Sequence, residues 1–288
     1  MADLGYLEEY VKEHREKMKN LNLNKIPLVI NAYGGPCSGK STTCLHLVSE
    51  LKKLGFSAEY VPEYAKELVY EKRYDLLDGS MEHQIDILIE QNKRIDRLVG
   101  NVDFIVSDSP IYLSYLYTNP EEFPKGISPF DNNDFLNLIS GLDLDYNTFY
   151  VFINRNENEF QTEGRIHTLE ESKNIDENIE WFLQDMGIFY GTYDHNSVDK
   201  ILPNCITTFS KLNNLDNDML ISQLKKNDLL NTLSDLKEYC SNEADRYGNW
   251  DFWEDKLDAL DYVISYCSKQ IPSKDFNKKG GKTKWNRK

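Results

Sequence analysis

The sequence predicts an α/β fold in which a parallel sheet is flanked by helices on both faces, with further helices at each end of the chain. The main observation is a regular alternation of apolar, strand-like runs with helix-like segments between residues 25 and 211. The second observation is the composition, because 40% hydrophobic residues over 288 positions are enough for a sizeable core. Together they indicate one α/β domain with helical additions.

A helix is expected near the N-terminus, in a part of the chain that spans residues 1–24. Its apolar side chains recur three or four positions apart and form one seam: Leu4, Leu7, Val11, His14, Met18 and Leu21. His14 lies on that seam. We therefore expect this histidine to pack in the core rather than to bind a ligand.

The predicted α/β domain occupies residues 25–211 and contains five strands. The strands are expected at residues 26–33, 57–61, 102–107, 147–153 and 188–193. A polar, turn-rich stretch at residues 213–217 marks the end of this domain. The sequence then predicts a helical extension at residues 212–272 and a basic, disordered tail at residues 273–288.

The first strand leads directly into a glycine-rich loop, Gly-Gly-Pro-Cys-Ser-Gly-Lys-Ser, at residues 34–41. This spacing between a strand and a helix is typical of a phosphate-binding P-loop, whose backbone N–H groups turn inward around phosphate oxygens. Lys40 is expected to reach the β- and γ-phosphates of ATP, and the Ser41 hydroxyl to ligate Mg²⁺. The predicted fold is thus the three-layer sandwich of P-loop NTPases. The residues expected to bind the nucleotide are Gly34, Gly35, Pro36, Cys37, Ser38, Gly39, Lys40, Ser41 and Thr42.

Two acidic residues follow strands of the predicted sheet. Asp108 ends an apolar run, the arrangement of a Walker B acid that holds Mg²⁺ or faces the transferred phosphate. Glu63 follows the second strand, and the ligand crevice of an open α/β sheet lies at the carboxyl ends of its strands. Glu63 could deprotonate an attacking hydroxyl, or it could cap the helix that begins at Tyr64. The base could be either acid, because both should reach the same crevice.

Further candidate residues lie on the helix expected at residues 81–99 and on a loop after the fourth strand. Gln84 and Gln91 are seven positions apart, near one helix face, where their amides could recognise a base or a carboxamide. The residues expected to bind the acceptor are Glu63, Tyr64, Gln84, Gln91 and Arg94. The loop carries Arg155 and Arg165, which we expect to close over the triphosphate as a lid.

The charge and the cysteines restrict the partners. A net charge of −15 argues against broad contact with nucleic acid, although the basic tail could be an electrostatic arm for it or a solubilising end. Five scattered cysteines form no Cys-x-x-Cys pair, so neither a zinc site nor a disulfide framework is indicated. No apolar stretch reaches the roughly 18 residues of a membrane helix. We expect a cytoplasmic protein without membrane contact, in the host cytoplasm if a bacteriophage encodes it.

Five motifs resemble, in order and spacing, a family of P-loop proteins. They are Gly34–Thr42, Val61–Val69, His83–Arg94, Val106–Pro110 and Gly164–Ser172. The family is the AAA-labelled ATPase/kinase family common in bacteriophages, related to the nicotinamide riboside kinase domain of NadR. The resemblance spans about residues 26 to 210 and implies a nucleoside-kinase-like fold rather than a hexameric AAA+ motor. It also implies the roles given above for the loop lysine and serine, the two acids and the two lid arginines.

The sequence therefore predicts an ATP- and Mg²⁺-dependent kinase that phosphorylates the hydroxyl of a nucleoside, a nucleotide or a nicotinamide riboside-like small molecule. One alternative is a kinase of hydroxymethylpyrimidine in phage DNA, which the basic tail would suit. Another is a nucleotide-dependent ATPase switch or interaction protein, whose partner would bind the apolar seams of the terminal helices. The same helical extensions could join copies of the chain in a homo-oligomer.

Overall fold

The computed structural model describes residues 4–21, 26–123, 134–156, 168–195 and 197–215, together with a few helical positions between 237 and 261. The chain divides into two compact units, Met1–Leu215 and Asp216–Lys288. The predicted lid residue Arg165, most of the predicted helical extension and the whole basic tail lie outside the described residues. None of the helices in the described ranges is long and apolar enough to cross a membrane.

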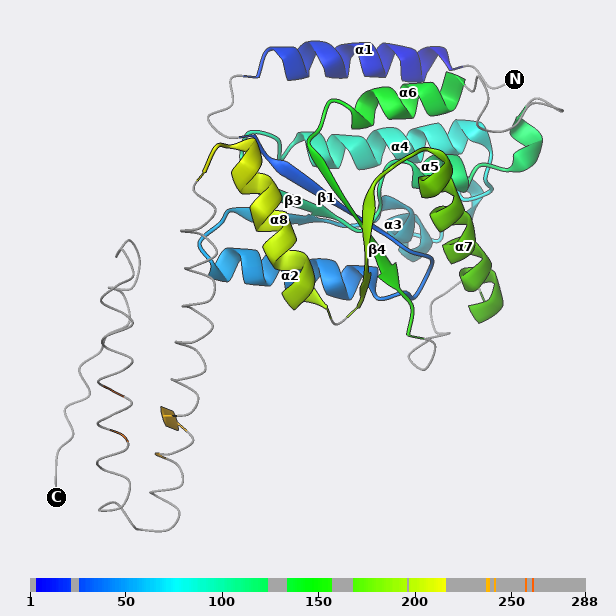
Figure 1. The fold of residues 1–288 in the computed structure, drawn as a ribbon. Coiled ribbons are helices and arrows are strands. Elements are labelled where there is room, and N and C mark those ends of the chain that lie inside the picture. Colours follow the sequence, from blue (N-terminus) through cyan, green and yellow to red (C-terminus); the bar gives the residue numbers. More distant parts are fainter. Residues whose placement is uncertain are drawn as a thin grey trace. The chain divides into compact units, whose positions relative to one another are not determined.

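A five-stranded parallel sheet forms the centre of the first unit and confirms the predicted fold class (Figure 1). The strands are β1 (Leu28–Tyr33), β2 (Ala58–Val61), β3 (Phe104–Ser107), β4 (Thr148–Asn154) and β5 (Tyr190–Asp194). Their order is β2-β3-β1-β4-β5, and every neighbouring pair is parallel. All five predicted strands are present, and each begins one or two residues later than predicted.

Helices cover both faces of the sheet, as the alternating pattern predicts (Figure 1). Helices α2 and α8 pack against each other and against β1, whereas α4, α6 and α7 share a hydrophobic core on the other face with α1. The helices are α1 (Gly5–Lys19), α2 (Lys40–Lys53), α3 (Tyr64–Tyr70), η1 (Tyr74–Leu76), α4 (Met81–Asp96), α5 (Leu113–Leu116), η2 (Pro120–Glu122), α6 (Asp134–Asp143), α7 (Leu169–Asp185) and α8 (Val198–Leu212).

The central strand β1 sets the position of the glycine-rich loop. All six residues of β1 are buried, which explains why its sequence is mostly apolar and shows no alternation of apolar and polar residues. Strand β1 lies between β3 and β4. After β1 the chain continues to β2 and β3 on one side of β1, and after β3 it continues to β4 and β5 on the other side of β1. The loop that follows β1 therefore sits at the switch point of the sheet, where the segments after β3 and β4 can reach it.

A buried histidine attaches α1 to the rest of this unit. His14 is 2% exposed, and its Nδ1 lies 3.1 Å from Oδ2 of Asp96. Its Nε2 lies 3.4 Å from Oδ2 of Asp145. Burial by itself would raise the pKa of Asp96, but hydrogen bonds from His14 and Tyr146 outweigh burial and lower it. The predicted core packing of His14 is confirmed.

The sequence analysis does not predict helix α6. This helix carries a buried acid that lies against the sheet. Its apolar residues do follow helical spacing, but the helix has only ten residues, too few for a strong periodic signal. It ends in Asp143, which is 5% exposed and accepts a hydrogen bond from the Tyr150 hydroxyl of β4. Burial raises the pKa of Asp143 to about 6, and the bond from Tyr150 offsets only part of this effect.

Replacing Asp143 by asparagine should stabilise the protein at about pH 8, with a gain that vanishes toward about pH 4. The unfolded chain releases this proton near the ordinary pKa of 3.8, and the folded chain releases it near 6. Wild-type stability should therefore fall as pH rises between these values, by on the order of 3 kcal/mol. The neutral amide avoids that loss, and thermal unfolding across this pH range measures it.

Asp185→Asn, at the exposed end of α7, controls for the removal of one negative charge. A gain for Asp143→Asn that is equal at both ends of the pH range would contradict the assignment of a raised pKa to this carboxyl.

Candidate functional site

The loop between β1 and α2 turns at two positions that require glycine. Gly34 has a φ of +137°, and a Cβ there would lie 2.6 Å from the Oγ of Ser38. Gly39 has a φ of +91°, and a Cβ there would lie 2.6 Å from the Cβ of His195. Any other residue would be strained at both positions. Gly39 also allows α2 to begin directly against the turn that follows β5.

The side chains of the loop are placed for an anion. The Nζ of Lys40 donates to the carbonyl oxygens of Gly34 at 2.5 Å and Gly35 at 2.9 Å, so the ammonium lies over the loop. Ser38 is 2% exposed, and its Oγ has no hydrogen-bond partner among the described residues. Buried polar groups are normally paired, so a buried hydroxyl without a described partner, in the same loop as the Lys40 ammonium, suits a phosphate ligand.

The two residues predicted to hold Mg²⁺ meet in the structure. The Ser41 hydroxyl donates to Oδ2 of Asp108 at 2.6 Å, although the two residues are 67 positions apart. The Tyr60 hydroxyl of β2 donates to the same oxygen at 2.5 Å. Burial, and then the bond to Asp108, raise the pKa of Tyr60 far above its ordinary value, so its phenol stays protonated and remains a donor. Sequence reasoning missed Tyr60, because alternation along β2 gives no sign of this contact.

The donor set around Asp108 fits a hydrated Mg²⁺ ion. Asp108 is 1% exposed, and within the described ranges its Oδ1 has no hydrogen-bond partner. A buried carboxylate oxygen without a partner is costly, and a cation or its bound water would satisfy it. In the part of the chain that the structure describes, no three His, Cys, Asp or Glu side chains gather around a common point. An ion at this site would therefore take most of its ligands from phosphate and water, as Mg²⁺ usually does.

Glu63 lies at the carboxyl end of β2, at the N-cap position of α3. Its side chain makes no capping hydrogen bond, but its position at the start of α3 suits a negative charge, so both predicted roles stay open. Burial raises the pKa of Tyr117, and the charges of Glu63 and Asp176 raise it further, which places both acids near this phenol. Because β2 pairs with β3, Glu63 and Asp108 follow adjacent strand ends.

Arg155 reaches the loop from the carboxyl end of β4. Its Nη1 donates to the carbonyl oxygen of Pro36 at 2.6 Å, and its Nε donates to Oδ2 of Asp176 at 2.8 Å. The other oxygen of Asp176 accepts a hydrogen bond from the backbone N–H of Gly35. Sequence reasoning missed Asp176, because its partners are 21 and 141 positions away and the pattern of α7 does not mark it.

The two glutamines of α4 have different surroundings. The Oε1 of Gln91 accepts from the Tyr64 N–H at 3.0 Å, and its Nε2 donates to the Pro62 carbonyl at 3.3 Å. This amide therefore holds the turn between β2 and α3. Gln84 is 5% exposed, and its amide forms no such bond to a described residue. Helix α4 begins beyond the carboxyl ends of the strands and runs back toward the start of β3. Gln84 comes seven residues before Gln91 on the same face of this helix, so it lies about 10 Å farther out than Gln91.

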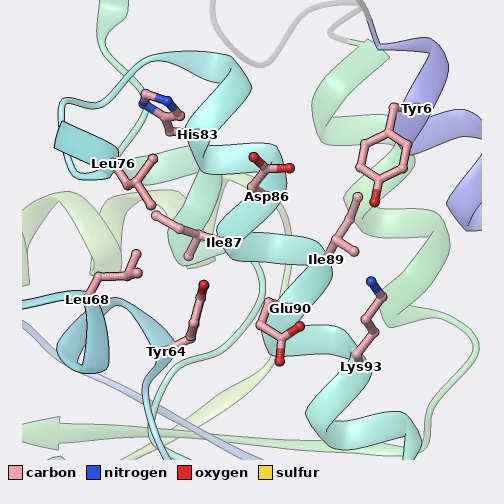
Figure 2. Close-up of a pocket in the computed structure, with 10 residues that line it drawn as sticks. All are labelled: Tyr6, Tyr64, Leu68, Leu76, His83, Asp86, Ile87, Ile89, Glu90 and Lys93. Carbon is pink, nitrogen blue, oxygen red and sulfur yellow. The ribbon is translucent and has the colours of Figure 1, made fainter. Parts of the chain in front are cut away.

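Tyr64 and Arg94 connect α3 to α4. The guanidinium of Arg94 donates to both carboxylate oxygens of Glu67, at 2.7 and 2.6 Å, and lies 4.8 Å from the centre of the Tyr64 ring. The hydrogen bond from Arg94 lowers the pKa of Glu67. Tyr64 also lines a pocket of about 240 Å³ between α1, α3 and α4, whose lining includes no residue of the glycine-rich loop (Figure 2). These contacts fix α3 next to Glu63, and the predicted acceptor contacts of Tyr64 and Arg94 stay predictions.

The fold and this loop define a P-loop nucleotide-binding protein. A strand, a glycine-rich loop, a helix and an acid at the end of the neighbouring strand stand in the arrangement that this class uses for nucleotide phosphates. The family described as an AAA domain matches residues 29–198, more than half of the 288 residues. The chain therefore belongs to this AAA domain family.

Curated relatives match a short part of the chain. Protein RecA from three strains of Clostridium perfringens is 38% identical over 85 residues. The matched segment is 28% of this chain and 24% of RecA, so the chain spans about a quarter of the length of these relatives.

Three solved structures are similar at low sequence identity. A NadR protein in complex with NR has a TM-score of 0.48 at 16% identity, over 75% of this chain and 61% of that chain. The APS kinase CysC of Mycobacterium tuberculosis has a TM-score of 0.28 at 19% identity, over 55% and 98%. APE1195 has a TM-score of 0.33 at 16% identity, over 66% and 97%. At these scores and identities, the three structures assign no activity to this chain.

Proposed function

We propose that the chain is an ATP- and Mg²⁺-dependent phosphotransferase that moves the γ-phosphate of ATP to the hydroxyl of a nucleoside, a nucleotide or a nicotinamide riboside-like small molecule. The observation that carries this proposal is the pair of acids at the ends of adjacent strands, Asp108 and Glu63, beside one P-loop. Phosphoryl transfer to an alcohol needs one acid near the metal and another near the acceptor hydroxyl. A nucleotide switch would need only the first.

The P-loop would bind the triphosphate. Its backbone N–H groups and the start of α2 offer hydrogen bonds and a positive end to the phosphates. Lys40 would exchange its two carbonyl partners in the loop for phosphate oxygens. Ser41 and Asp108 would hold Mg²⁺, which when bound neutralises charge on the phosphates.

The two acids would have separate roles. Oδ2 of Asp108 accepts two hydrogen bonds, one of them from Ser41, the other residue predicted to hold Mg²⁺. Glu63 follows the carboxyl end of β2, where the crevice of a parallel sheet lies. Glu63 would therefore orient the acceptor hydroxyl and take its proton as the oxygen attacks the γ-phosphorus. We assign the base to Glu63 and the metal to Asp108.

Arg155 would stabilise the charge that develops on the transferred phosphoryl group. Its side chain is 5% exposed, and its guanidinium lies against the loop carbonyl of Pro36, so it is already next to the proposed position of the triphosphate. Asp176 would keep this arginine and the Gly35 amide together before ATP binds. The predicted lid role of Arg165 complements this arrangement.

Gln84 would recognise the acceptor. A buried amide with no bond to the described residues can offer one donor and one acceptor to a planar group, and nucleobases and carboxamides present that pair. Gln84 also lies on the face of α4 that carries Gln91, two helical turns closer to the start of the helix. Gln91 has backbone partners at both ends of its amide and supports the turn that carries Glu63.

Glu63→Gln should lower the rate of phosphate transfer about a hundredfold or more, because the amide cannot accept the proton. The affinity for ATP should stay unchanged. Transfer is measured by mass spectrometry of the acceptor, and ATP binding by calorimetry. Glu59→Gln is the matched control, since Glu59 lies on β2, four residues before Glu63, and its exposed side chain pairs with Lys52 at 2.8 Å. Wild-type transfer by Glu63→Gln would remove Glu63 as the base.

Gln84→Ala and Gln91→Ala should distinguish recognition of the acceptor by Gln84 from structural support of the turn between β2 and α3 by Gln91. Gln84→Ala should raise the KM for the acceptor about tenfold, with the KM for ATP unchanged. Gln91→Ala should lower the melting temperature, because two backbone groups lose their partner. Steady-state kinetics and thermal unfolding of both variants test this. An unchanged acceptor KM in Gln84→Ala would contradict the proposed contact.

A further inference from the structure

Tyr60 is the second donor to the carboxylate of Asp108. It is the third residue of β2, and it pairs in register with Val106 of β3, two positions before Asp108. The phenol oxygen lies 2.5 Å from Oδ2 of Asp108, within the range of a charge-assisted hydrogen bond. Ser41 donates to the same oxygen from the start of α2. One carboxylate oxygen thus connects α2, β2 and β3.

The two oxygens of this carboxylate are used unequally. Oδ2 accepts two hydrogen bonds, whereas the buried Oδ1 accepts none from the described residues. Donors on one oxygen fix the rotation of the carboxylate and therefore the direction of the other oxygen. Without the phenol, Ser41 would be the remaining donor on Oδ2 among these contacts, and the carboxylate could rotate more freely. The residue that is proposed to hold the cation would then no longer be preorganised.

We propose that Tyr60 is a positioning residue for the cation site: its phenol holds Asp108 so that Oδ1 and the Ser41 hydroxyl are presented together to the Mg²⁺ of a bound nucleotide. This proposal rests on the proposed function in its assignment of Asp108 to the metal. It adds a residue outside every nucleotide-binding motif of the chain.

The test is the dependence of ATP binding on Mg²⁺ in Tyr60→Phe, which removes the hydroxyl and keeps the ring. Calorimetry with ATP in Mg²⁺ and in EDTA gives the factor by which Mg²⁺ strengthens binding. This factor should fall about tenfold in Tyr60→Phe, the effect expected for one charge-assisted hydrogen bond. ATP affinity in EDTA should stay at the wild-type value. A wild-type Mg²⁺ factor in Tyr60→Phe would overturn the proposal.

Two further variants separate positioning from a general structural effect. Tyr193→Phe is the matched control, because the Tyr193 hydroxyl also has one side-chain partner, Asn204 at 2.9 Å, but lies away from Asp108. It should leave the Mg²⁺ factor unchanged. In an Asp108→Asn background, Tyr60→Phe should have no further effect on that factor, because the phenol acts through Asp108. A full effect in that background would overturn the proposal, and so would an equal loss in Tyr193→Phe.

The binding measurement also distinguishes this proposal from the proposed function. If the wild-type protein binds Mg²⁺–ATP but phosphorylates no acceptor, the phosphotransferase assignment fails and the Mg²⁺ factor of Tyr60→Phe still decides the role of Tyr60. If Mg²⁺ does not strengthen ATP binding to the wild-type protein, Asp108 holds no nucleotide-bound cation and the proposal for Tyr60 is overturned.

Discussion

The carboxylate of Asp108 is the contact on which the arrangement of this site depends. Its Oδ2 binds Ser41 at the start of α2 and Tyr60 on β2, while its backbone follows β3. The parallel sheet makes this possible, because β3 lies between β2 and β1 and brings the ends of all three strands to one edge. Buried charges in proteins are normally paired, and one oxygen of this carboxylate is left for a ligand.

The P-loop is also held from the opposite side of β1. Asp176 on α7 binds the Gly35 amide and Arg155, and Arg155 binds the Pro36 carbonyl. Arg155 and Asp176 are mostly buried, so their attraction is screened less than that of a surface pair. The loop is thus supported by β3 on one side and by β4 and α7 on the other. Such support preorganises the phosphate site before a nucleotide arrives.

The sequence predicts the sheet and the loop well because their signals are local. Five apolar runs predict β1 to β5, and the spacing of the glycines predicts the P-loop. Asp108 is predicted as a site residue because it comes directly after the third apolar run. Residues missed by the prediction are those whose role depends on distant partners, such as Tyr60 and Asp176. Local pattern also cannot separate Gln84 from Gln91, since both lie on one face of α4 and differ only in the backbone that each meets. Helix α6 was missed because ten residues give a weak periodic signal.

The central claim is that this crevice transfers phosphate rather than only hydrolysing ATP. The most direct measurement incubates the wild-type protein with ATP, Mg²⁺ and a pool of nucleosides, mononucleotides, nicotinamide riboside and DNA that contains hydroxymethyluracil. Mass spectrometry then shows which compound gains one phosphate. A phosphorylated small molecule is expected. Loss of ATP without any phosphorylated acceptor would contradict it and favour a nucleotide switch, and a product found in DNA alone would favour a DNA kinase.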